Sequence, residues 1–250
     1  MRPQEEFKHV IALVESGMND CEIARLTGIP RGTIIEWRHK SSLGWAPGLS
    51  AGAHFHCPIC NDQPLDGPTY AYLFGMYLGD GYLSLGPRGL YRLRIAMDQK
   101  YPHIMAECID AINTIKSRGK PASRVHAAGC DEIYSYWKHW ICLFPHYGPG
   151  PKHLRNIELE TWQKEIVTEF PELLIRGLIQ SDGCRYTNRV NRGYEYISYN
   201  FTNNSLQIQR IFADACDQLG IRWRQATWKN IAITRRPDVA ILDLIVGPKS

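Results

Sequence analysis

The sequence predicts an α+β protein that contains two copies of one unit, with a small all-α domain in front. The first observation is an internal repeat: residues 70–80 and 173–182 each form an apolar, helix-like segment that ends in Asp-Gly. The same order of patterns then follows each segment, namely strands, a helix and further strands. Finally, the pattern of residues 4–39 predicts three short helices. Two copies of one α+β unit packed about a pseudo-twofold axis are the simplest architecture for the repeat.

The composition is that of a globular protein, with 250 residues, of which 44% are hydrophobic and 22% are charged. The net charge is +4, and the excess lies in residues 61–250 because residues 1–60 carry equal numbers of acidic and basic residues. So small an excess permits nucleic-acid binding without arguing for it. No run approaches the roughly 18–20 apolar residues of a membrane helix, and no signal-peptide core is present. We therefore expect a soluble, cytoplasmic protein with no membrane contact.

The main domain is expected over residues 68–250, in halves of about 68–160 and 161–250. Strands alternate polar and apolar residues, whereas amphipathic helices repeat every three to four residues. The elements expected after the first Asp-Gly are strands over 82–97, a helix over 102–115 and strands over 123–126 and 133–137. Those expected after the second are strands over 186–201, a helix over 205–219 and strands over 223–228, 231–234 and 241–246.

Small residues recur four positions apart in both Asp-Gly segments, at Gly75 and Gly79 in the first and at Gly177 and Ser181 in the second. Residues four apart lie on one face of a helix. Glycine inside a helix costs about 1 kcal/mol relative to alanine, so two matching pairs need a reason. A close crossing of the two helix backbones supplies one.

The segments end in Asp80 and Asp182, each followed by a helix-stopping glycine, Gly81 and Gly183. A helix C-terminus carries partial negative charge, so an anion there is unfavourable, and two adjacent carboxylates also repel each other. Divalent cations bound between them would remove both penalties. Mg²⁺ favours carboxylate and phosphate oxygens, and two such ions hold the attacking water and the leaving oxygen of a phosphodiester. A single Asp-Gly is also a common turn after a helix, so the inference depends on the pair.

The segments LFGMYLGDG and IRGLIQSDG, residues 73–81 and 175–183, resemble the two LAGLIDADG motifs of single-chain homing endonucleases. This resemblance covers about residues 68–250. It implies two αββαββα halves with the motif helices at their interface, each half presenting a saddle-shaped sheet to the DNA major groove. It also implies that Asp80 and Asp182 bind the catalytic Mg²⁺ or another divalent cation.

The sixth motif position is often acidic in that family, but here it holds Leu78 and Gln180. Because the position varies in the family, we do not interpret the change as a loss of activity.

Further catalytic positions follow from the same resemblance. A polar residue that closes the second strand and approaches the site through water corresponds to Gln99, 19 residues after Asp80, and to Asn203, 21 residues after Asp182. A basic residue late in each half, which supports the transition-state charge, corresponds to Lys152 and Lys249. These two lysines also fit ordinary exposed side chains.

Strand side chains that face the groove should recur with a period of two. The candidates for contact with double-stranded DNA are Arg92, Arg94, Lys100, Arg185, Arg189, Arg192, Tyr196 and Tyr199. Each one alone also fits a solvated sheet face, so the hypothesis concerns the set.

Residues 20–37 resemble the helix-turn-helix of resolvases and many bacterial regulators, with the small Ala24 at the helix crossing and Gly28 in the turn. The residues expected in its core are Ile23, Leu26, Ile29, Ile34 and Trp37. In the major groove, those expected near bases or phosphates are Arg31, Thr33, Glu36, Arg38 and Lys40. A helical hairpin that binds protein is the alternative. We place this domain at 1–40 and a linker with a Cys-x-x-Cys knuckle at 41–67.

Cys57 and Cys60 have the spacing of a zinc knuckle, and His54, His56 or a distant cysteine would complete a structural Zn²⁺ site. The sequence has no second Cys-x-x-Cys, so a thiol-bearing turn is the alternative. Among the other cysteines, Cys108, Cys142 and Cys216 are expected in the core, whereas Cys130 and Cys184 are candidate distant ligands.

These expectations favour a monomeric, Mg²⁺-dependent endonuclease that cuts both strands of DNA at a specific site. A transcription regulator on a catalytically inactive scaffold of the same type is the alternative. The retained pair Asp80 and Asp182 favours the enzyme, whereas the helix-turn-helix favours the regulator.

Overall fold

The computed structural model describes residues 4–42, 57–61, 63–117, 119–127, 130–190 and 193–247. The chain divides into two compact units, Met1–His56 and Cys57–Ser250, which we describe separately. Four residues named above, His54, His56, Arg192 and Lys249, lie outside the described ranges, as does the side chain of Lys40.

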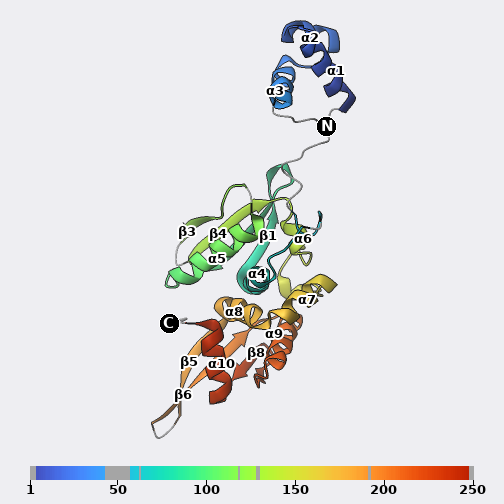
Figure 1. Cartoon of the computed structure of the whole chain (residues 1–250). Coiled ribbons are helices and arrows are strands. Elements are labelled where there is room, and N and C mark those ends of the chain that lie inside the picture. The colour runs from blue at the N-terminus through green and yellow to red at the C-terminus, as the bar shows by residue number, and fades with distance from the viewer. Residues whose placement is uncertain are drawn as a thin grey trace. The chain divides into compact units, whose positions relative to one another are not determined.

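The N-terminal unit consists of three helices, α1 (Gln4–Glu15), α2 (Asp20–Thr27) and α3 (Arg31–Ser42) (Figure 1). A capping box starts α2: the Asn19 side chain accepts from the backbone of Glu22, whose carboxylate accepts from the Asn19 backbone. The left-handed Gly28 (φ 67°) ends the helix. The buried core consists of Phe7, Val10, Ile23, Ile29, Ile34 and Trp37.

Leu26 is a correction to the expected core, since its side chain is 63% exposed. The buried side of α2 contains Ile23, with Ala24 and Thr27 partly covered beside it. Leu26 follows Ile23 by three residues, which is less than one full turn, so its side chain projects from the edge of the buried face.

The second unit begins with the half α4 (Gly67–Asp80), β1 (Gly81–Leu85), β2 (Tyr91–Met97), α5 (Pro102–Lys116), β3 (Ser123–Ala127), β4 (Cys130–Trp137) and α6 (Trp140–Leu143). The second half is α8 (Pro171–Asp182), β5 (Gly183–Val190), β6 (Tyr194–Thr202), α9 (Leu206–Gln218), β7 (Arg224–Thr227), β8 (Asn230–Ile233) and α10 (Arg236–Val246). The two αββαββα halves are therefore confirmed. A helix that the sequence did not predict, α7 (Thr161–Glu169), connects them.

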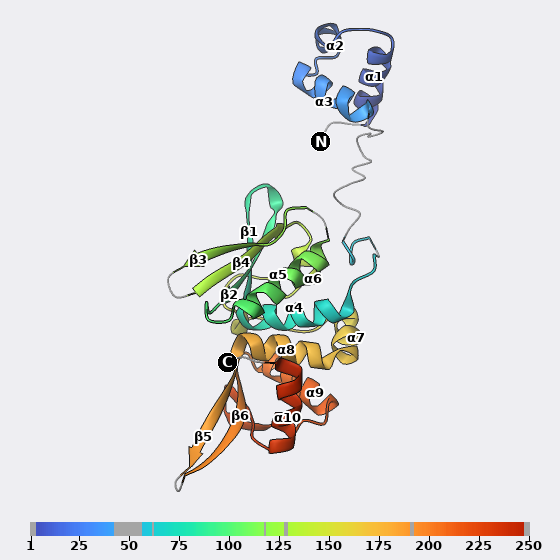
Figure 2. The same cartoon turned by 60° about the vertical axis from the view of Figure 1, so that its left-hand side comes forward.

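The two sheets have the same topology, β1-β2-β4-β3 and β5-β6-β8-β7, with antiparallel pairing throughout. Figure 2 shows α4 and α8 side by side, with one sheet on each side of the pair. Leu93, Ile95 and Ile133 turn one face of the first sheet into the core, and Arg92 and Arg94 alternate with them on the other face.

The segment 241–246 was expected to be a strand, and this is wrong, because it forms the end of α10. Its run of isoleucine, leucine and valine suggested a strand. The buried residues of this helix are Val239, Leu242 and Val246, which recur three and four positions apart, whereas Leu244 is 87% exposed. This is the period of a helix packed on one side.

In the described residues, no helix is both long enough and apolar enough to cross a membrane.

Candidate functional site

The two motif helices cross in direct backbone contact at Gly75 and Gly177. A Cβ atom on Gly75 would lie 2.6 Å from the carbonyl oxygen of Leu174, and one on Gly177 would lie 2.3 Å from that of Tyr72. Both distances are too short for any side chain. The sequence needs glycine on both sides because each backbone occupies the position of the other's side chain.

The contact continues to the C-terminal ends of the helices through Gly79 and Ser181. A Cβ atom on Gly79 would lie 2.1 Å from Ser181 Oγ and 3.3 Å from the carboxyl carbon of Asp182. The Ser181 hydroxyl donates to the carbonyl of Gly177, at 2.8 Å, which keeps it within its own helix. The carboxylate of Asp182 is therefore held against the last turn of α4, the turn that ends in Asp80.

Gly81 and Gly183 follow the aspartates, but neither has the left-handed backbone of a typical helix-stopping glycine. Their φ angles are −80° and −102°. A Cβ atom on Gly81 would lie 2.5 Å from the Cα of Tyr77, and one on Gly183 would lie 2.7 Å from the Cα of Ile179. Glycine is needed here because each strand starts by folding back onto the last turn of its helix.

Each aspartate lines a cavity that the other half helps to close. The Asp80 cavity has a volume of about 310 Å³, and its polar lining comes from Asp80, Asp98, Lys100, Gln180, Ser181 and Arg185. The Asp182 cavity has a volume of about 340 Å³, and its polar lining includes Lys152, Asp182, Asn203, Asn204 and Lys229. The two cavities are pseudo-symmetric in position but differ in the groups that surround the carboxylate.

Asn203 contacts Asp182 directly, with its side-chain nitrogen 2.6 Å from Asp182 Oδ2. The side-chain oxygen of Asn203 accepts from the backbone of Ser205, at 2.8 Å, which fixes the orientation of the amide. Ser205 in turn caps α9. The resemblance implied that Asn203 approaches the site through water, and in the structure it hydrogen-bonds Asp182 directly.

Lys152 approaches the same carboxylate from the opposite half of the protein. Its Nζ atom donates to the carbonyls of Tyr77, Leu78 and Gly79, with distances of 2.7 Å to Leu78 and 2.6 Å to Gly79. The cation therefore lies at the negative end of α4. Burial of the ammonium group lowers the pKa of Lys152 to about 8, although the nearby carboxylates act in the opposite direction.

Gln99 contacts the neighbouring strand β4. Its side-chain nitrogen donates to Oδ1 of the buried Asp131 on β4, at 2.8 Å, and Asp131 also binds Arg124 and His126. Of its neighbours, Asp98 and Lys100 line the Asp80 cavity and form an ion pair at 2.9 Å. Asp98 was not among the predicted site residues. The signal for it is its position, because it directly follows the second strand of this half and precedes Gln99.

Gln180, at the sixth motif position, has a structural contact. It is buried and accepts a hydrogen bond from the Tyr72 hydroxyl across the helix pair, at 2.8 Å. Lys229 lines the Asp182 cavity from the turn between β7 and β8, and no sequence signal pointed to it.

The strand arginines have acidic or aromatic neighbours. Arg92 pairs with Glu132 and lies 4.5 Å from the ring centre of Tyr134. Arg94 is 3.4 Å from Glu132 and 4.9 Å from the ring centre of Tyr82. These contacts orient both guanidinium groups on the uncovered face of the first sheet.

The arginines of the second sheet also have acidic partners, but one predicted groove residue of this sheet is buried. Tyr199 is fully buried and donates to Asp243 of α10, at 2.7 Å, so the expectation that it faces a groove is wrong. Arg185 pairs opposite Tyr199 in the sheet register and binds Asp243 through two nitrogens, at 2.8 and 3.2 Å. Arg189 lies on the same face and pairs with Glu195 at 3.0 Å. Tyr196 is three positions from Tyr199 in β6, so it lies on the other face of the sheet.

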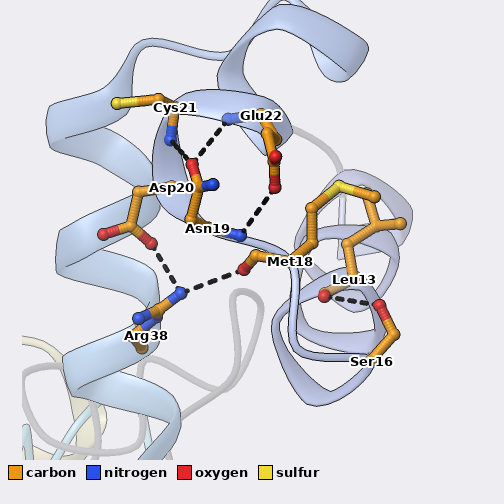
Figure 3. A network of polar contacts seen from close by, with 8 residues as sticks. All are labelled: Leu13, Ser16, Met18, Asn19, Asp20, Cys21, Glu22 and Arg38. Carbon is orange, nitrogen blue, oxygen red and sulfur yellow. Dashed lines mark hydrogen bonds and ion pairs between the residues drawn. The ribbon is translucent and has the colours of Figure 1, made fainter.

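In the N-terminal unit, Arg38 of α3 is 2.7 Å from Asp20 and also donates to the carbonyl of Met18, at 3.4 Å (Figure 3). It therefore connects α3 to the start of α2. Arg31 is exposed and Thr33 is partly exposed at the start of α3.

No family model and no curated protein matches the chain. Among solved structures, I-DmoI in complex with DNA and Mn superposes with a TM-score of 0.50 and 15% identity, covering 74% of this chain and 99% of that one. The second unit has the LAGLIDADG fold. The meganuclease I-AabMI bound to uncleaved DNA matches with a TM-score of 0.46 and 12% identity, covering 70% and 82% of the two chains. The N-terminal LAGLIDADG domain of DUF199/WhiA matches with a TM-score of 0.44 and 12% identity, covering 78% and 88%.

Proposed function

We propose that the protein is a site-specific, metal-dependent endonuclease that cuts both strands of DNA. One observation supports this most strongly: the crossing of α4 and α8 holds the Asp182 carboxylate against the helix turn that ends in Asp80. A fold that only needed a turn would gain nothing from two acidic helix ends at one point, where each carboxylate meets the negative pole of a helix.

The donor set fits a hard divalent cation such as Mg²⁺, because carboxylate oxygens are its preferred protein ligands. Asp80 and Asp182 would hold the metal ions. When bound, these ions would activate water and neutralise charge on the leaving oxygen of the phosphodiester.

The other groups of the site have supporting roles. Asn203 fixes the rotamer of Asp182 through its hydrogen bond to Oδ2. Lys152 donates to three carbonyls, so it acts as a fixed positive charge rather than as a mobile proton donor. Such a charge stabilises the negative charge that develops on phosphate oxygens in the transition state.

DNA binding would use the uncovered sheet faces, where Arg92 and Arg94 are already oriented by Glu132. Phosphates would compete with this carboxylate for the arginines. The three-helix unit would add contacts through Arg31 and Thr33 at the start of α3. Lys100, Arg185 and Lys229 surround the two cavities, where the DNA backbone would pass.

A regulator that binds DNA without cutting it is the second candidate. The three-helix unit fits that role.

The test incubates the full chain with a randomised plasmid library and Mg²⁺, and sequences the ends that appear. Asp80→Asn and Asp182→Asn are nearly isosteric and remove only the charge. We expect cutting at one sequence by the wild type and none by either variant, with DNA binding retained in all three. Binding without cutting by the wild type would favour the regulator, and cutting by both variants would reject the assigned site.

A further inference from the structure

Two segments of the second unit bring sulfur and nitrogen ligands to one point, away from the aspartates. Cys60 Sγ is 3.2 Å from Cys142 Sγ and 3.5 Å from His139 Nδ1, and Cys142 Sγ is 3.7 Å from the same nitrogen. With Cys57, all four ligand atoms lie within 4.8 Å of one another.

The two sulfur–nitrogen distances match a tetrahedral metal site, and the sulfur–sulfur distance of 3.2 Å is somewhat shorter than in such a site. Zinc–sulfur bonds of about 2.3 Å and zinc–nitrogen bonds of about 2.0–2.1 Å place neighbouring sulfurs about 3.8 Å apart and sulfur and nitrogen about 3.5 Å apart. A disulfide would need a separation of about 2.05 Å between two sulfurs, and it would leave the other two groups unexplained.

The local structure at Cys57 also fits a metal ligand. Cys57 is fully buried, and the backbone N–H of Cys60 points at its sulfur, at 3.4 Å. An N–H aimed at a sulfur stabilises the thiolate form, which is the form that binds metals.

The sequence carries a signal that matches this cluster. Cys57 and Cys60 are separated by two residues, and so are His139 and Cys142. Two such pairs, far apart in sequence and adjacent in space, are the usual layout of a four-ligand structural zinc site. Cys142, which we expected to be an ordinary core residue, belongs to this cluster, whereas Cys130 and Cys184 do not.

We propose that Cys57, Cys60, His139 and Cys142 form a closed structural site for one Zn²⁺. All four positions are filled by protein, so no coordination position remains for catalysis. The site fastens the turn at the start of the second unit to α6, and the Tyr70 hydroxyl binds the carbonyl of Leu143 beside it, at 2.7 Å. Asp80 is ten residues after Tyr70 in α4, which corresponds to roughly 15 Å at 1.5 Å per residue. The proposed zinc is therefore separate from the proposed catalytic metal.

The test purifies the full chain under reducing conditions without added metal and measures its metal content by mass spectrometry. We expect about one zinc per chain in the wild type and its loss in Cys142→Ser. Cys130→Ser is the matched control, because Cys130 is a partly exposed cysteine like Cys142 but outside the cluster, and it should keep its zinc.

A second variant keeps the test decisive if Cys142→Ser fails to fold. His139→Cys offers four thiolates and should retain the metal, and Co²⁺ substitution should give the strong visible absorption of tetrahedral thiolate cobalt in both wild type and variant. A metal-free wild type after incubation with Zn²⁺, or a Cys60–Cys142 disulfide in the reduced protein, would overturn the proposal. None of these measurements depends on DNA cleavage.

Discussion

Gly75 and Gly177 face each other across the crossing of α4 and α8, so closely that a Cβ atom on either would lie 3.0 Å from the Cα of the other. This contact sets the distance between the two halves of the LAGLIDADG unit. It also explains why the helices accept a residue that weakens a helix by about 1 kcal/mol.

Gly177→Ala should therefore destabilise the second unit. Alanine favours the isolated helix, but its methyl group would lie 2.3 Å from the carbonyl oxygen of Tyr72, which is backbone and cannot rotate away. Forcing an extra methyl group into a packed contact costs about 1–3 kcal/mol. Urea denaturation of the full chain measures this. Gly32→Ala in α3 is the control, since nothing lies within 4 Å of its added methyl group, and it should be neutral or stabilising. Equal effects of both substitutions would contradict the close crossing.

The helix crossing and the repeat were predictable from sequence because both depend on local spacing. Gly75, Gly177 and the two aspartates occupy matching positions in segments whose helical period is unambiguous. The succession of helix, strands, helix and strands along each half followed from the same repeat.

The failed predictions depend on tertiary contacts. Tyr199 is buried because α10 covers that face of the second sheet, and α10 was not expected to be a helix. Similarly, Cys142 meets Cys60 only after segments distant in sequence have packed together. Residue type and spacing mark Cys57/Cys60 and His139/Cys142 as two pairs of possible ligands, but they do not specify that the two pairs meet.

If the proposed function is right, the catalytic groups at the two cavities should cleave their respective DNA strands at unequal rates. Asn203 donates to Asp182, whereas its counterpart in the first half, Gln99, donates to Asp131 of β4, and the groups that line the two cavities differ. A hydrogen bond to a charged group is worth about 1.5–3 kcal/mol, so Asn203→Ala should slow one strand's cleavage by about 10- to 100-fold. Nicked plasmid should then accumulate before linear product. Gln99→Ala is the matched variant in the other half, and equal effects of the two variants on the nicking pattern would reject this asymmetry.

Lys152 should make the stability of the protein vary with pH in the alkaline range. Burial lowers its pKa to about 8 in the folded state, below the ordinary value of 10.5. Between these values the unfolded chain binds more protons, so the stability contributed by Lys152 rises as the pH rises from 8 to 10.5. Denaturation of the wild type and Lys152→Met across this range isolates the effect, because the other titrating groups are shared. Parallel curves for the two proteins would show that the lysine keeps its ordinary pKa.

Lys152 should also make the cleavage rate depend on pH, but the rate should fall as the pH rises, whereas the stability rises. If its positive charge supports the transition state, the cleavage rate should fall as the pH rises through about 8. Lys152→Arg should keep whatever activity it has to higher pH, because arginine does not lose its proton in this range. The rate is measured under single-turnover conditions, which separate the chemical step from product release. A fall at the same pH in the arginine variant would exclude Lys152 as its cause.

Arg38 was expected to bind DNA, but its pair with Asp20 also gives it a role within the three-helix unit. The arginine side chain is 45% exposed, and exposed pairs contribute about 0–1 kcal/mol, so Arg38→Ala and Asp20→Asn should each lower stability slightly. Their effects on DNA affinity separate the two roles. If Arg38 also contacts phosphate, Arg38→Ala should weaken binding and reduce its salt dependence, whereas Asp20→Asn should leave the salt dependence unchanged. Equal losses of affinity in both variants would mean that Arg38 acts by holding α3 in place, and that Arg31 and Thr33 provide the contacts with DNA.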